Sequence, residues 1–313
     1  MAVGNSLAKT GQQRMGLAAY MTQDAVKNQI NTIIGGKNGP RFISSIVSAV
    51  QSTPALQECT NTSIVSAALL GESLNLSPSP QLGQYYMVPY DNRNKGVKEA
   101  QFQLGYKGYI QLAIRSGQYK KLNVLAIKEG ELVRFDPMDE EIEVKLIDDE
   151  YEREQAKTIG YYAMFEYTNG FKKAMYWSKK KMMAHADRFS PAFHVSAVAD
   201  NNPKRCRVSF EDFEAGKYPS GDAWKYSSFW YKDFDGMAYK TMLRQLISKW
   251  GIMSIDLVSA LDADMAVIHE DGTKQYVEAE DVVADVQEHE DITEDSTQEA
   301  PAENADAAAD FFS

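Results

Sequence analysis

The stretch QFQLGYKGYIQLAIRSG, residues 101–117, decides the fold because its hydrophobic period changes partway through. Gln101–Tyr106 alternates polar and apolar residues, as a half-buried strand does. Lys107–Gly117 instead carries apolar residues at helical spacing. The stretch therefore predicts a strand that leads directly into a helix.

The flanking sequence repeats both patterns. Thr168-Asn169-Gly170 lies between two aromatic-rich runs, and an Asn-Gly in that position is typical of a β-hairpin turn. Further strands are expected at Gln84–Tyr90, Leu122–Lys128, Ile142–Leu146, Ile159–Tyr167 and Phe171–Trp177. Helices are expected at Phe42–Val50, Ile64–Leu70, Ser178–Phe189 and about Tyr231–Trp250. The chain therefore mixes hairpins with helices throughout its middle part.

Charge divides the chain after Leu261. Residues 1–261 hold 32 Lys and Arg against 27 Asp and Glu, whereas residues 262–313 hold one base against 17 acids. The total of −11 therefore sums a basic body and an acidic tail, and does not exclude nucleic acid as a partner. We expect a flexible arm over 1–38 with at most one helix, a folded domain over 39–261 and a disordered acidic tail over 262–313.

Composition excludes several function classes. No apolar run is long enough to span a membrane, and no secretory leader is evident, so we expect a cytoplasmic protein. Cys59 and Cys206 form no metal or redox motif. Gly35-Gly36-Lys37 is not a P-loop, and nucleophile-elbow, HExxH and zinc-deaminase motifs are missing. We therefore expect a binding protein, not an enzyme, that needs no cofactor, with Mg²⁺ only as a counterion of DNA.

Two helices offer faces suited to a phosphate backbone. Lys107, Gln111 and Arg115 recur every four residues and share one side of the first. In the second, Lys240, Thr241 and Arg244 lie beside an apolar stripe. These faces predict either a DNA groove or ordinary solvated surfaces, and spacing alone does not separate the two.

Basic clusters and aromatic residues extend this hypothesis. Lys179–Lys181 and Lys204–Arg207 bind phosphate or simply keep the surface soluble. Aromatic rings beside bases suit single strands, since every nucleobase has a face that stacks. The candidates are Tyr85, Tyr86, Phe102, Tyr106 and Trp230, for which the alternative is a place in the core. The ten acids of residues 136–154 suggest a solvated outer face, with a metal site as the alternative.

Four ordered segments resemble the RecT family of phage single-strand annealing proteins. The most specific is FQLGYKGYIQLAIRSG, residues 102–117. The others are LNLSP with LGQYYMVPY (74–78 and 82–90), residues 177–190, and WYKDFDGMAYKTMLR (230–244). Tyr239 departs from the pattern, since a second lysine is common there. The resemblance covers about residues 40–255.

The resemblance implies an α+β core with a central antiparallel sheet and packed helices. It implies a DNA-binding domain that assembles into rings or helical filaments in a bacterial host. Partners would be single-stranded DNA, the annealed duplex, a phage 5′→3′ exonuclease and a host single-strand binding protein. Together, resemblance and residues give a set expected to contact DNA: Tyr86, Gln103, Tyr106, Lys107, Gln111, Arg115, Lys181, Arg205, Arg207, Lys240, Thr241 and Arg244.

Three functions are weighed. The first is ATP-independent annealing of complementary strands; the second is passive single-strand binding; the third is a metal-dependent nuclease using the acids of 136–154. The tail is either a solubilising appendage, a competitor of DNA or a docking segment, and its Asp310-Phe311-Phe312 resembles the acidic-aromatic tips of single-strand binding proteins.

Overall fold

Four helices come first along the described part of the chain. The structure is a computed structural model that describes residues 15–276 except 36–37, 93, 140, 191 and 270. The helices are α1 (Leu17–Met21), α2 (Asp24–Ile34), α3 (Gly39–Gln51) and α4 (Asn61–Ser73). Met21 and Ile30 are fully buried, so the expectation of a flexible arm over 1–38 is corrected for α1 and α2. Polar Gln and Asn residues between the apolar positions had weakened the periodicity of this stretch.

A four-stranded antiparallel sheet lies against α4. Its order is β1 (Tyr85–Asn92), β2 (Val97–Leu104), β8 (Ala266–Ile268) and β9 (Lys274–Tyr276). Helix and sheet meet closely, because a Cβ added at Gly71 would lie 2.4 Å from the Tyr85 ring. Strand β2 continues into α5 (Tyr106–Arg115), as residues 101–117 predict.

A second sheet is built from β3 (Tyr119–Lys128), β6 (Thr158–Tyr167) and β7 (Lys172–Ser178). The predicted hairpin at Thr168-Asn169-Gly170 joins β6 to β7, and Gly170 takes the left-handed φ of 88° that favours glycine. A separate ribbon pairs β4 (Leu132–Asp136) with β5 (Glu141–Val144) and precedes α6 (Glu150–Gln155).

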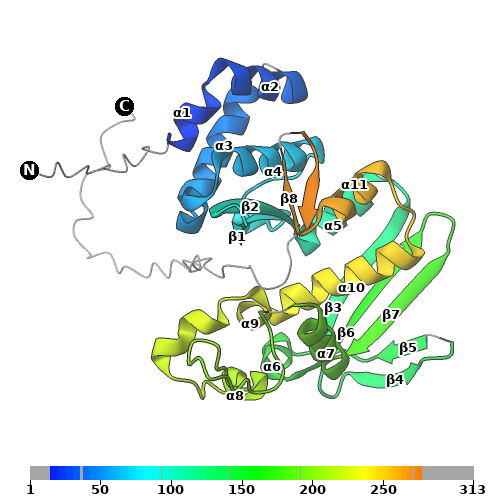
Figure 1. The fold of residues 1–313 in the computed structure, drawn as a ribbon. Helices are drawn as coiled ribbons and strands as arrows, with labels where there is room; N and C mark the ends of the chain where they lie inside the picture. Colours follow the sequence, from blue (N-terminus) through cyan, green and yellow to red (C-terminus); the bar gives the residue numbers. More distant parts are fainter. Residues whose placement is uncertain are drawn as a thin grey trace, which may run out of the picture.

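Helix α10 (Phe234–Trp250) crosses the middle of the molecule (Figure 1), with α1–α4 and the first sheet on one side and the second sheet on the other. It packs on both β6 and α5. The single helix expected from about Tyr231 is divided into α9 (Phe229–Lys232) and α10, because Asp233 has φ −140° and ψ 71°. Its Oδ1 accepts a hydrogen bond from the Gly236 N–H at 2.8 Å, which caps α10.

Several short elements complete the fold. They are α7 (Lys179–Phe189), α8 (Phe210–Glu214), α11 (Ile255–Ala263) and the 3₁₀ turns η1 (Pro54–Glu58), η2 (Pro80–Leu82) and η3 (Ser220–Tyr226). The expected α+β class, with antiparallel sheets and packed helices, is confirmed.

The folded region continues past the boundary expected after Leu261. Strand β8 pairs with β2, Ala266 and Val267 are fully buried, and β9 continues the sheet to Tyr276. The acids of residues 262–276 led to the expectation of a tail there, although the same stretch contains three consecutive apolar residues, Ala266–Ile268. Residues 277–313, where most of the acidic tail falls, lie outside the described residues.

Candidate nucleic-acid interface

The start of α5 is fixed by two glycines. A Cβ at Gly105 would lie 2.1 Å from the backbone oxygen of Gly83, and one at Gly108 would lie 2.1 Å from that of Gln84. Any other residue would push α5 away from the segment before β1. The close approach explains the spacing of the two glycines in Gly105-Tyr106-Lys107-Gly108.

This contact gathers three predicted residues, which we call the α5 cluster: Tyr86, Tyr106 and Lys107. A Cβ added at Gly83 would lie 3.0 Å from the Tyr86 hydroxyl and 3.4 Å from the Lys107 Cδ, so both side chains lie over this glycine. The Lys107 Nζ is 6.0 Å from the centre of the Tyr106 ring. Lys107 is exposed and both tyrosines are partly exposed, so the cluster presents a cation together with two aromatic rings.

Arg115 has a different role from Lys107. Its guanidinium donates to the carbonyl oxygens of Leu74 and Asn75, at 2.5 and 3.3 Å. Helix α4 ends there with Asn75 at φ 51°, while the Leu76 N–H donates to the Gly71 oxygen. Arg115 therefore ties α5 to the end of α4, while Gln111, one turn earlier, is exposed.

A buried carboxylate organises the predicted face of α10. Asp264 Oδ1 accepts from the Lys240 Nζ at 2.9 Å, and Oδ2 accepts from the Arg244 Nη1 at 3.0 Å. The Leu104 N–H donates to Oδ1 at 2.9 Å and the Tyr109 hydroxyl to Oδ2 at 3.3 Å. Burial, followed by the charge of Asp264, raises the pKa of Tyr109. This cluster of two cations and one carboxylate has a formal charge of +1.

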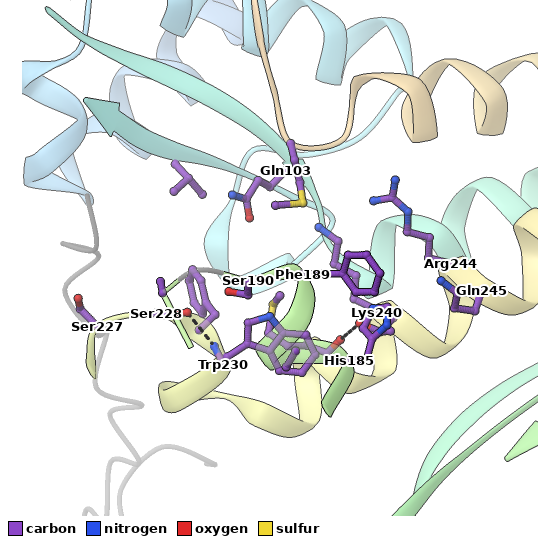
Figure 2. A pocket seen from close by; sticks show the side chains of 17 residues that line it. Gln103, His185, Phe189, Ser190, Ser227, Ser228, Trp230, Lys240, Arg244 and Gln245 are labelled. Atoms are coloured by element: carbon purple, nitrogen blue, oxygen red, sulfur yellow. Dashed lines mark hydrogen bonds between the residues drawn. The ribbon is translucent and has the colours of Figure 1, made fainter. Parts of the chain in front are cut away.

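A cavity of about 440 Å³ opens beside this ion cluster (Figure 2). It lies among β1, β2, α7, α9 and α10. Its wall contains the predicted residues Gln103, Lys240, Thr241 and Arg244. Phe189, Phe229 and Trp230 add aromatic surface, and Met265 an apolar one. We call this site the inter-sheet cavity.

The inter-sheet cavity and the α5 cluster adjoin one another. Tyr86 is paired with Gln103 across β1 and β2, so both side chains emerge on one face of the sheet. The Tyr86 ring also lies 5.8 Å, centre to centre, from that of Phe229 in the cavity wall. One continuous surface therefore carries most of the predicted residues, namely Tyr86, Gln103, Tyr106, Lys107, Lys240, Thr241 and Arg244.

Helix α7 carries a further predicted cation, Lys181, which does not itself line the cavity. The Lys181 Nζ lies 4.5 Å from the centre of the Trp177 ring, and Lys181 is exposed. His185, one turn along α7, lines the cavity and was not predicted. Burial first, then the charges of Arg188, Arg244 and Lys181, lowers the pKa of His185. Burial is therefore the main cause, and the three nearby cations act in the same direction.

The other candidates lie outside this surface or in the core, or have their polar group bonded within the fold, as Thr241 of the cavity wall does. Arg207 donates to the backbone oxygens of Lys225 and Arg205, so it holds its own loop together. Arg205 is exposed, with its Nη1 4.0 Å from Asp200. The Thr241 hydroxyl donates to the Met237 oxygen. Of the five aromatic candidates, Tyr85, Phe102 and Trp230 are buried in the core, although Trp230 also reaches the cavity wall.

The described acids of residues 136–154 are spread over the end of β4, over β5, over α6 and over the turns between these elements. Glu141 and Glu143 are exposed and alternate with half-buried Ile142 and Val144, as expected for a solvated outer face. Among the described residues, no three His, Cys, Asp or Glu side chains are grouped as metal ligands would be. Within the same ranges, no helix is long and apolar enough to cross a membrane.

Comparison with known proteins extends over most of the chain. The RecT family matches residues 40–284. The uncharacterized protein YqaK of Bacillus subtilis strain 168 is 33% identical over 297 residues, which cover 94% of this chain and 87% of that protein. Protein RecT of Escherichia coli strain K12 is 26% identical over 250 residues, 79% of each chain.

Proposed function

This chain belongs to the RecT family and is a phage-type single-strand annealing protein of DNA recombination, and we propose that it binds single-stranded DNA along the inter-sheet cavity and the α5 cluster. It would then promote pairing with a complementary strand without ATP. The observation that carries this proposal is the continuity of the two sites through Tyr86, Gln103 and Phe229. Rings and cations occur together on this surface, a combination typical of proteins that bind single strands.

The cations of this surface suit a protein that anneals any sequence, because the exposed ones would contact phosphates and not bases. Lys107, Lys181 and Arg244 reach solvent and would contact phosphates, which carry no sequence information. Lys240 is only 8% exposed and paired with Asp264, so it would contribute to the formal charge of +1 of the ion cluster and not to a direct phosphate contact. Complementarity would be decided by Watson–Crick pairing between the strands.

Assembly would multiply these contacts. We propose rings or helical filaments in which the surfaces of successive copies join, so that weak contacts add along one strand. A phage 5′→3′ exonuclease would supply the single strand, and a host single-strand binding protein would be displaced from it. Mg²⁺ would act only as a counterion of the DNA.

An annealing assay tests the proposal against passive single-strand binding. Two complementary oligonucleotides carry a fluorophore and a quencher, and their pairing rate is followed with and without protein, in the absence of nucleotide. Pairing faster than the protein-free rate supports annealing. Pairing slower than that rate would replace the proposal with passive binding, and loss of full-length substrate on adding Mg²⁺ would point to a nuclease.

A further inference from the structure

The inter-sheet cavity has an apolar part that phosphate contacts do not explain. Its walls include Phe229, Trp230, Met237 and Met265. Met265 has φ 69°, a conformation that costs a residue with a Cβ roughly 1 kcal/mol or more. Its backbone is held there, because its N–H donates to the Phe102 oxygen and its oxygen accepts from the Gln101 side chain. An exposed apolar side chain is thus fixed at the cavity by strained backbone.

One side of the cavity is cationic. Asp264 engages the Nη1 of Arg244, whose side chain is still 40% exposed. A guanidinium has five N–H donors, so Arg244 is able to hold a second carboxylate while it stays paired with Asp264. A ligand that matches this site would carry apolar rings next to an acid.

The chain itself contains such a sequence in Asp310-Phe311-Phe312. We propose that Phe311 and Phe312 of the same chain occupy the inter-sheet cavity, with Asp310 beside Arg244, so that the acidic segment after Tyr276 competes with single-stranded DNA. Two phenylalanine rings would bury apolar surface against Met265 and Trp230. The 13 acids of residues 277–313 would place further negative charge near the basic surface.

The start of this segment lies close to the cavity. Tyr276 is paired across β8 and β9 with Ala266, which directly follows Met265 of the cavity wall. Phe311 follows Tyr276 by 35 residues. A flexible chain of that length has a root-mean-square span of roughly 30–35 Å. The segment therefore begins near the proposed site and is long enough for its tip to reach that site.

Because the tip is tethered to the domain, the strength of its competition with single-stranded DNA follows from its effective concentration. Effective concentrations of tethered groups are on the order of 1 mM. If the untethered tip bound with a dissociation constant of about 0.1 mM, competition would weaken DNA binding roughly tenfold. The acidic contribution would fall as salt screens it, whereas the phenylalanine contribution would persist.

A first experiment locates the tip without using DNA. A nitroxide is attached to Ser313→Cys in the full chain, with Cys206→Ser to leave only the buried Cys59. Methionine methyl NMR signals are then compared, with Met265 assigned by Met265→Leu. We expect the Met265 methyl to be broadened, and the broadening to be lost in Phe311→Ala/Phe312→Ala. Equal signals with and without the nitroxide would overturn the proposal, as would broadening that increases with protein concentration, which would indicate a second copy.

A second experiment measures the competition, and this part rests on the proposed function. Phe311→Ala/Phe312→Ala leaves every acid in place, whereas the control Asp285→Asn/Glu288→Gln removes two charges and leaves the tip intact. We expect the first variant to bind a labelled single strand about tenfold more tightly at low salt and the control less than twofold. A larger gain in the control would refute competition by the tip. Failure of all variants to bind DNA would refute the proposed function, while the NMR result would still stand.

Discussion

Replacing Asp264 with asparagine removes the charge that holds Lys240 and Arg244 together, and leaves the shape of the side chain unchanged. The Asp264 side chain is fully buried and the side chain of Lys240 is 10% exposed, so water would not replace the lost carboxylate. Removing one partner of a buried ion pair costs roughly 3–5 kcal/mol. Because Arg244 is 40% exposed and is able to turn toward solvent, we expect the lower end, about 3 kcal/mol.

Urea unfolding, followed by tryptophan fluorescence, measures this loss of free energy directly. For a domain of this size, about 3 kcal/mol also lowers Tm by roughly 6–12 °C. The control is Asp262→Asn, two residues earlier, where an exposed carboxylate pairs with Lys274 at the surface and should matter little. A loss below about 1 kcal/mol for Asp264→Asn, or equal losses for both variants, would refute the reasoning that Asp264 organises this part of the fold.

Three further predictions concern α5 and α7. Lys107→Ala/Gln111→Ala should weaken binding equally for all single-strand sequences and flatten the salt dependence by about one phosphate contact. The free energy of unfolding should stay unchanged, because both side chains are exposed. An unchanged slope in a salt titration would contradict the assignment of Lys107. Gly108→Ala should lower the free energy of unfolding in urea by roughly 1–3 kcal/mol, because its Cβ would meet the Gln84 oxygen. Gly221→Ala should leave that free energy unchanged, because a Cβ there would have no atom within 4 Å. Equal effects of the two variants would refute the close approach of α5 to Gln84. Burial lowers the pKa of His185 in the folded protein, so as pH falls below the ordinary value of 6.5 the unfolded chain takes up the proton first and the free energy of unfolding decreases. His185→Gln should remove that part of the loss between pH 6.5 and 5. Identical profiles of stability against pH for the two proteins would contradict this prediction.

Local patterns predicted the elements whose partners are near in sequence. The Asn169-Gly170 turn joins two adjacent strands, and the change of period at residues 101–117 marks the start of α5. Ser178 was expected to begin a helix, and its hydroxyl does accept from the Lys181 N–H. These features depend on residues within a few positions of one another, so the sequence contains all the information they need.

The ion cluster depends on distant partners. Asp264 is 24 residues from Lys240 and 160 from Leu104, and it stands in an acidic stretch that resembles a solvated tail. Arg115 and Arg207 have the residue type of phosphate contacts, yet both donate to backbone oxygens that only the folded chain brings near. Helical spacing predicts which face of a helix carries a cation, but it does not predict which groups that face contacts in the folded protein.

The most direct measurement of the central claim is photo-cross-linking of a bromodeoxyuridine-containing single strand to the full chain, with peptides mapped by mass spectrometry. Stacked rings cross-link most readily, so we predict adducts at Tyr86, Tyr106 and Phe229, reduced in Lys107→Ala/Gln111→Ala. Adducts confined to the exposed β4–β5 ribbon, with none on the cavity or the α5 cluster, would contradict the account.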